Sequence, residues 1–396
     1  MGNTVSHKLF TILYLLHILT PILHAASPKI VKSVPGFPGI LPFYLETGYV
    51  GVGDNEEVQL FYYFIKSERD YERDPLMVWL TGGPGCSALS GLVLEIGPLI
   101  FNTSACNWHS EAPTFQLNPS SWTKIANIIF LDSPVGTGFS YATNPEGYYS
   151  DDITSSRHIY QFLRKGYILG NPFTWKFDSK QSKLDYAHRV SLLSDDLYES
   201  TRLNCDDSND DVDNVKCALN LQTVSYNLDP LFDAHVLRPK CVSHQTWCQE
   251  SIYYLLENWS NDIQVRAALH IREGTKSSWI RCNKTLAYEN NVESTFGYHQ
   301  NLTQDYIRAL IYSGDQDMKV SYVGTLEWIN MLNVSISEDW RPWFVNGQVA
   351  GYTTKFSNDK YHVTFATVKG AGHTAPEYKR SECFTMLLKW FAMLPL

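Results

Sequence analysis

Three loops of this sequence carry groups that could take part in acyl transfer. Thr81 precedes the run Gly-Gly-Pro-Gly at 82–85, and consecutive glycines let backbone N–H groups approach a developing oxyanion. Residues 313–317 (Ser-Gly-Asp-Gln-Asp) hold two acids close together. Three small residues lead into His373, a candidate general base. Each pattern alone is weak evidence for a catalytic site, and the three together are far more specific evidence.

Short apolar runs stand before these loops. Leu76–Leu80, Ile128–Leu131 and Ala309–Tyr312 each stop at Thr, Asp or Ser, which is typical of strands buried on both faces of a parallel sheet. Another strand is expected over Tyr361–Lys369, directly before the histidine loop. Because an open α/β fold carries its chemistry at the carboxyl ends of its strands, the loops are expected at one sheet edge. An acid followed by a histidine is also the second half of the Ser-Asp-His order of α/β-hydrolases.

The other sequence patterns complete the prediction of an α/β fold. Tyr49–Val52 and Val58–Ile65 flank a Gly-Asp-Asn turn and predict a hairpin. Phe384, Leu387, Leu388 and Phe391 have helical spacing and predict a helix near the C-terminus. The more polar stretch at about 181–302 is expected to be a cap or insertion over the sheet. We therefore expect a mostly parallel sheet with flanking helices and a cap.

Composition excludes several classes of protein. The chain has 396 residues and a formal net charge of −9, and 44% of its residues are hydrophobic, which excludes wholesale disorder. The acidic balance argues against a nucleic-acid partner, since backbone binding needs a basic footprint. No cofactor and no metal are expected. The acidic loop between Cys205 and Cys217 lacks the glycine and terminal glutamate of a calcium loop.

The N-terminus predicts entry into the secretory pathway. Lys8 precedes an apolar run over Leu9–Leu23, and small residues follow at 25–27, so residues 1–26 read as a signal peptide and 27–396 as the mature domain. The run is short for a membrane anchor, so no membrane association is expected after cleavage. Five glycosylation sequons agree with export: Asn102, Asn258, Asn283, Asn301 and Asn333. The predicted location is extracellular or vacuolar.

Eight cysteines in an oxidising compartment predict disulfides before metal ligands. Cys205 and Cys217 are close in sequence, as are Cys241 and Cys248, and each pair could close a local loop. Neither pair has a second pair at zinc-finger spacing, so zinc is not expected.

Longer motifs resemble the plant serine carboxypeptidase-like family. They are WLTGGPGCSAL, EIGPL, NIIFLDSPVGTGFSYA, YSGDQDMKV, DWRPWFVNGQVAGY and KGAGHTAPEYK, in that order. The resemblance covers nearly everything from about Val34 to Trp390. It implies an α/β-hydrolase fold and a Ser-His-Asp triad that acts through a serine acyl-enzyme.

The resemblance also assigns individual residues. It makes His373 the base, Asp317 the acid that orients it, and Asp315 a residue that shapes the loop. It places an oxyanion-hole donor at Gly83, with Gly82 and Thr81 beside it in the substrate-binding loop. The family's disulfide pattern joins Cys86 to Cys282, Cys205 to Cys217 and Cys241 to Cys248, and leaves Cys106 and Cys383 without assigned partners.

The sequence departs from the family at the nucleophile. The family places its serine in a Gly-Asp/Glu-Ser-Tyr-x-Gly elbow between segments that correspond to Phe162–Lys165 and Gly166–Pro172 here, and in this chain those segments abut. No Gly-x-Ser-x-Gly run occurs anywhere in the chain. The absent piece would hold a strand, the nucleophile turn and a helix, which is about 30 residues or more. Ser140 is the nearest substitute, and Ser87 is a weaker one.

Two classes of function remain open. In the first, the chain is a catalytically impaired splice or gene-model variant of a serine carboxypeptidase or glucose-ester acyltransferase, with a small ester or peptide as the substrate of its parent. In the second, it is a non-catalytic homologue that binds a ligand or a partner. Carboxypeptidases of the family carry Asn where this chain has Thr81, which favours acyl transfer over peptide hydrolysis for the parent. The sequence does not set the oligomeric state.

Overall fold

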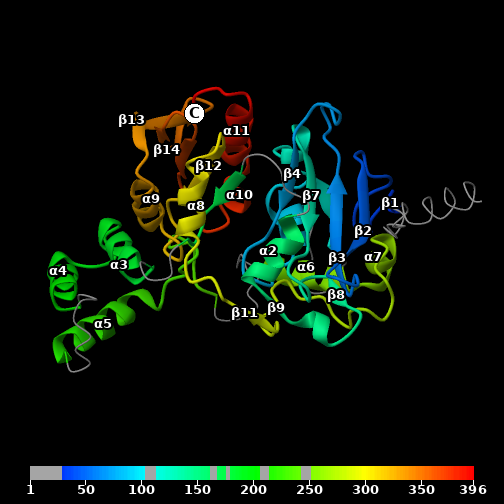
Figure 1. Cartoon of the computed structure of the whole chain (residues 1–396), viewed down its shortest axis with the longest axis horizontal. Coiled ribbons are helices and arrows are strands. Elements are labelled where there is room, and N and C mark those ends of the chain that lie inside the picture. The colour runs from blue at the N-terminus through cyan, green and yellow to red at the C-terminus, as the bar shows by residue number, and fades with distance from the viewer. Residues whose placement is uncertain (1–28, 103–112, 161–166, 175–178, 206–213, 242–250) are drawn as a thin grey trace, which may run out of the picture.

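The fold is built on two separate β-sheets (Figure 1). It was obtained as a computed structural model, which describes residues 29–102, 113–160, 167–174, 179–205, 214–241 and 251–396. The predicted signal peptide, Cys106, Cys248 and the Lys165–Gly166 junction lie outside these residues. No helix among the described residues is long and apolar enough to cross a membrane.

The first sheet has the strand order β1-β2-β3-β7-β4, with β8 paired to β3. These strands are β1 (Lys29–Val31), β2 (Leu45–Val52), β3 (Val58–Ile65), β4 (Leu76–Trp79), β7 (Asn127–Leu131) and β8 (Tyr141–Ala142). β2 and β3 form the predicted hairpin, with Val52 opposite Val58. β4 runs parallel to β7, as expected of the apolar runs that end in chemistry-bearing loops.

The second sheet has the order β10-β12-β15-β14-β13. Its strands are β10 (Tyr167–Gly170), β12 (Arg308–Gly314), β13 (Ser335–Val345), β14 (Gln348–Ser357) and β15 (His362–Val368). β10, β12 and β15 are parallel, and β14 and β13 continue the sheet as an antiparallel hairpin. The predicted strands at Ala309–Tyr312 and Tyr361–Lys369 are confirmed as β12 and β15.

The prediction that Leu76–Leu80 is buried on both faces is wrong. β4 pairs only with β7 among the described strands, so its other edge carries no strand. Leu76 is 60% exposed and Leu80 is 41% exposed. β10 likewise pairs only with β12 within the described part of the chain, and Gly170 at its end is exposed. Among the described strands, β4 and β10 are therefore edge strands of their sheets.

Helices and short strands surround the sheets. The α-helices are α2 (Asp152–Tyr160), α3 (Ser179–Arg189), α4 (Asp195–Asn204), α5 (Val215–Leu228), α6 (Ser251–Asn261), α7 (Ile263–Ala268), α8 (Phe296–Leu302), α9 (Tyr322–Met331), α10 (Ala375–Tyr378) and α11 (Arg380–Phe391). Three short helical turns are η1 (Gly91–Glu95), η3 (Trp122–Lys124) and η4 (Glu146–Tyr148). The small strands are β5 (Leu99–Phe101), β6 (Phe115–Leu117), β9 (Ser150–Asp151) and β11 (Tyr288–Glu289). α3, α4 and α5 project away from both sheets (Figure 1).

One hydrophobic core joins the two sheets although their strands do not pair. It includes Phe130 of the first sheet and Tyr312 of the second, and Trp79 of β4 and Ile168 of β10 pack against it. Leu94 of η1 lies in the same core. The carbonyl of Leu94 accepts a 2.7 Å hydrogen bond from Arg380, at the start of α11. The C-terminal helix, predicted from its spacing, thus closes the seam between the sheets.

The disulfides follow two of the expected pairings. Cys86 is bonded to Cys282, and Cys205 to Cys217. Cys241 is also disulfide-bonded, while its expected partner lies outside the described residues. Cys383 is a buried free thiol on α11.

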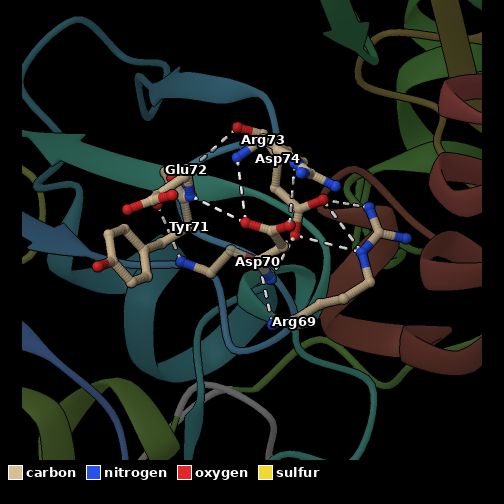
Figure 2. Close-up of polar contacts among 8 residues, drawn as sticks. Arg69, Asp70, Tyr71, Glu72, Arg73 and Asp74 are labelled. Carbon is tan, nitrogen blue, oxygen red and sulfur yellow. Dashed lines mark hydrogen bonds and ion pairs between the residues drawn. The ribbon is translucent and has the colours of Figure 1, made fainter.

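A tight loop between β3 and β4 sets where the strand before the glycine loop begins. Asp74 accepts hydrogen bonds from the Ser67 hydroxyl and the Asp70 N–H, and it pairs with Arg69 (Figure 2). The buried Asn127 on β7 holds the same loop, since its amide accepts from the Ser67 N–H and donates to the carbonyls of residues 71 and 74. The start of β4 is therefore tied to β7 by side chains as well as by the ladder.

Asn127→Ala should destabilise the fold by roughly 2–4 kcal/mol, because it leaves buried backbone groups without partners. Arg69→Ala is the matched control: Arg69 is 57% exposed in its ion pair with Asp74, so its loss should cost under about 1 kcal/mol. Urea denaturation of both variants measures the difference. Equal losses would show that the exposed ion pair, and not Asn127, holds the loop.

Candidate active site

The expected acid and base meet at the ends of two neighbouring strands. β12 and β15 pair in parallel, with Gly314 opposite Val368, so the loops after them start side by side. Nδ1 of His373 lies 2.8 Å from Oδ2 of Asp317. The Asp317 side chain is fully buried, and that of His373 is 33% exposed. Since an ionised carboxylate can only accept, Nδ1 carries the hydrogen and Nε2 is the free basic nitrogen.

Backbone and amide donors complete the surroundings of Asp317. Oδ1 accepts from the N–H groups of Lys319 at 2.8 Å and Val320 at 3.2 Å. Oδ2, the oxygen that faces His373, also accepts from Nδ2 of Asn171 at 2.8 Å. Asn171 is a residue that the sequence reasoning missed. The available signal was a Gly-Asn-Pro run directly after a strand, at 170–172.

Asp315, the other acid of this loop, contacts the base loop instead. Its carboxylate accepts from the N–H of Gly370 at 2.7 Å, and Gln316 donates to the same oxygen. Burial raises the pKa of Asp315, and the hydrogen bonds from Gln316 and Gly370 oppose that rise. These contacts fit the expected role of shaping the loop that carries His373.

A short segment after α5 holds both loops, and the sequence reasoning did not identify it. The carbonyl of Asp233 accepts from the N–H groups of Met318 and Lys319, and the N–H of His373 donates to the carbonyl of Ala234 at 2.7 Å. A Cβ at Gly372 would lie 2.3 Å from that same carbonyl oxygen, so only glycine permits the approach. The segment therefore links the acid loop, the base loop and the helical insertion.

The glycine loop lies at the end of β4, in the first sheet. Gly82 and Gly83 are exposed, and a Cβ at Gly83 would come within 2.8 Å of the N–H nitrogen of Gly85. Trp79 donates to the hydroxyl of Thr81 at 3.1 Å. The Cys86–Cys282 disulfide anchors the loop at its far end. The loop keeps exposed backbone N–H groups of the kind that an oxyanion hole needs.

Neither alternative serine is free to act as a nucleophile. Ser140 is fully buried, donates to the carbonyl of Asp132 at 2.6 Å and accepts from the N–H of Phe61 at 2.7 Å. Ser87 is also fully buried and donates to the carboxylate of Asp132 at 2.6 Å. Both hydroxyls hold the first sheet together, and neither contacts His373.

Three of the five sequons present exposed asparagines: Asn258, Asn301 and Asn333. Asn102 and Asn283 are half-buried, and the amide of Asn283 donates to the carbonyl of Gly136. In the described residues no group of three or more His, Cys, Asp or Glu side chains could hold a metal ion.

Comparison with known proteins gives the same family as the sequence motifs. The family model described as serine carboxypeptidase matches residues 35–165 and 164–393, which is most of the chain. The chain belongs to the serine carboxypeptidase family. Its match falls into two segments, and these meet at the Lys165–Gly166 junction.

Two plant relatives match this serine carboxypeptidase homologue along its whole length. Serine carboxypeptidase-like 10 of Arabidopsis thaliana is 40% identical and covers 100% of both chains, and serine carboxypeptidase-like 13 of the same plant is 41% identical over 98% of this chain and 99% of the relative. The first alignment has 450 positions and this chain has 396 residues, so at least 54 positions (450 less 396) have no residue here.

A solved structure shares the fold. Kex1(delta)p, a prohormone-processing carboxypeptidase from Saccharomyces cerevisiae, superposes with a TM-score of 0.67 at 16% identity, over 89% of this chain and 91% of that chain. The fold is thus the expected α/β-hydrolase fold.

A buried glutamate lies at the seam between the two sheets. Glu95 ends η1 and is 5% exposed. Burial and the nearby charge of Glu377 raise its pKa, the charges of Arg281 and Arg380 oppose the rise, and the resulting pKa is about 8. The folded protein therefore holds a proton on Glu95 that the unfolded chain releases at neutral pH.

This linkage predicts a loss of stability with rising pH. A raised folded-state pKa contributes stability that is complete below pH 4.5 and is lost as the pH rises to about 8. The melting temperature of the wild type should therefore fall over that window relative to Glu95→Gln, which cannot ionise. Glu273→Gln, at an exposed position, is the control and should follow the wild type. If the melting temperatures of the wild type and Glu95→Gln changed in parallel with pH, that result would contradict the raised pKa of Glu95.

Proposed function

We propose that this chain is a secreted serine carboxypeptidase-like protein that retains the acid, the base and the oxyanion loop of its family but lacks the nucleophile. The observation that carries the proposal is that the family match falls into two segments, which overlap at residues 164–165 beside the Lys165–Gly166 junction. That point falls between α2 and β10, and β10 is the edge strand of the second sheet. At least 54 alignment positions without a residue leave room for a strand, a turn and a helix.

The remaining groups support binding without turnover. Gly82 and Gly83 are exposed, so their N–H groups could donate hydrogen bonds to a carbonyl oxygen, and Nε2 of His373 could accept a proton. An acyl-enzyme also requires an activated oxygen at about 3 Å from that nitrogen. Ser140 and Ser87, the serines closest to the elbow pattern or in the oxyanion loop, are buried and hydrogen-bonded elsewhere. A small ester or peptide could then bind and remain intact.

The reaction of the intact parent is acyl transfer through a serine. Hydrolysis of a C-terminal peptide bond and transfer from a glucose ester share the acyl-enzyme and differ in the attacking group. Thr81 is the residue that favours the acyltransferase branch, because a hydroxyl cannot present the two amide donors that grip a carboxylate. Its hydroxyl also accepts from Trp79, which occupies part of its capacity. The signal peptide and the disulfides support an extracellular or vacuolar location.

His373→Ala tests the proposal directly. In this chain the substitution should leave any residual ester hydrolysis unchanged, because no acyl-enzyme depends on the base. In a version with a Gly-Asp/Glu-Ser-Tyr-x-Gly elbow segment inserted at the Lys165–Gly166 junction (the elbow-restored version), the same substitution should lower kcat by about 10³-fold or more. Hydrolysis of a chromogenic ester measures both.

His362→Ala is the matched control, since His362 is an exposed histidine at the start of β15, the strand that precedes the His373 loop. It should leave activity unchanged in both versions. A large loss from His373→Ala in the 396-residue chain itself would overturn the proposal, because a nucleophile would then have to be present.

A further inference from the structure

We propose that Asn171 is a positioning residue that orients Asp317 toward His373. The inference rests on the proposed function only in taking Asp317 and His373 as the acid and base. Asn171 follows β10 directly and lies in the Gly166–Pro172 segment, to which the sequence analysis assigned no catalytic or positioning role.

One carboxylate oxygen of Asp317 accepts hydrogen bonds from both Asn171 and His373. Nδ2 of Asn171 and Nδ1 of His373 each lie 2.8 Å from Oδ2 of Asp317. The other oxygen accepts two backbone N–H groups, from residues 319 and 320. An ionised carboxylate offers about four lone-pair sites, so this set satisfies it completely. Without Asn171, the oxygen that faces the imidazole would be held by the imidazole alone.

The orientation of the Asn171 amide is itself determined. Its Oδ1 accepts from the N–H of Gly314 at 3.2 Å, so its NH₂ group must face Asp317. Its backbone N–H donates to the carbonyl of Tyr312 at 2.8 Å. Asn171 is 4% exposed and has φ of 44°, a left-handed conformation that asparagine tolerates better than most residues. The amide is therefore a rigid donor.

Charge makes this donor important. Asp317 is fully buried, and among the described residues its one ion-pair partner is His373. A buried carboxylate without a permanent cation depends on hydrogen-bond donors to stay ionised and in place. Asn171 supplies a neutral donor that leaves the imidazole free to gain and lose its proton.

The test compares one substitution of Asn171 that keeps the backbone conformation with one that keeps the shape of the side chain. Asn171→Gly permits the positive φ and removes the donor, while Asn171→Asp keeps the acceptor for Gly314 and replaces the donor with a carboxyl group. Asn346→Gly is the control, because Asn346 has φ of 50° at an exposed turn. NMR of the ¹⁵N-labelled histidines in the 396-residue protein reports the tautomer of His373, assigned with His373→Ala.

In the wild type and in Asn346→Gly, neutral His373 should carry its hydrogen on Nδ1. Asn171→Gly should shift a measurable fraction to the Nε2–H tautomer. Asn171→Asp adds a second carboxyl group beside Asp317, so it should favour the imidazolium of His373, with hydrogens on both nitrogens. Unchanged ¹⁵N shifts of His373 in both variants would overturn the inference.

Activity of the elbow-restored version separates this inference from the proposed function. There Asn171→Gly should lower kcat by about 10²-fold with KM unchanged, as expected for a misplaced catalytic group. An unchanged kcat would count against Asn171. Reaction of the 396-residue chain itself with a serine reagent would overturn the proposed function alone, since the NMR comparison does not depend on a nucleophile. If Asn171→Gly fails to fold, the ¹⁵N shifts of His373 in Asn171→Asp and the kcat of that variant in the elbow-restored version decide the question.

Discussion

Parallel pairing of β12 with β15 is the interaction on which the remaining site depends. Seven consecutive residue pairs run from Arg308 opposite His362 to Gly314 opposite Val368, so both strands end at the same level. The acid loop and the base loop then begin next to each other, and short connections suffice to bring Asp317 to His373. β10 extends the same ladder and delivers Asn171 to the acid. All three side chains are thus positioned within one sheet.

The glycine loop belongs to the other sheet. β4 carries it, and among the described strands β4 pairs with β7 alone. A shared core and the hydrogen bond from Arg380 to Leu94 join the two sheets. The exposed leucines at 76 and 80 are apolar surface that a neighbouring strand or helix would cover. The proposed loss of the elbow therefore affects the sheet and the chemistry at the same position.

Much of this could be predicted from the sequence, because the signals are local. Apolar runs that end in glycine or acidic loops identified β4, β7, β12 and β15, and the Asp-to-His order located the 2.8 Å pair. The exposure of Leu76 was missed because burial depends on which strands are adjacent, and periodicity does not report that. Asn171 and the segment at Asp233–Ala234 were missed because their contacts join residues that are distant in sequence.

The most direct test of the account is labelling with a fluorophosphonate, which reacts with activated serines. It should be applied to this chain and to the elbow-restored version side by side, with the adduct mapped by mass spectrometry. The account predicts that only the restored version is labelled, on the serine of the restored segment. A mapped adduct on any serine of the 396-residue chain, Ser140 included, would contradict it.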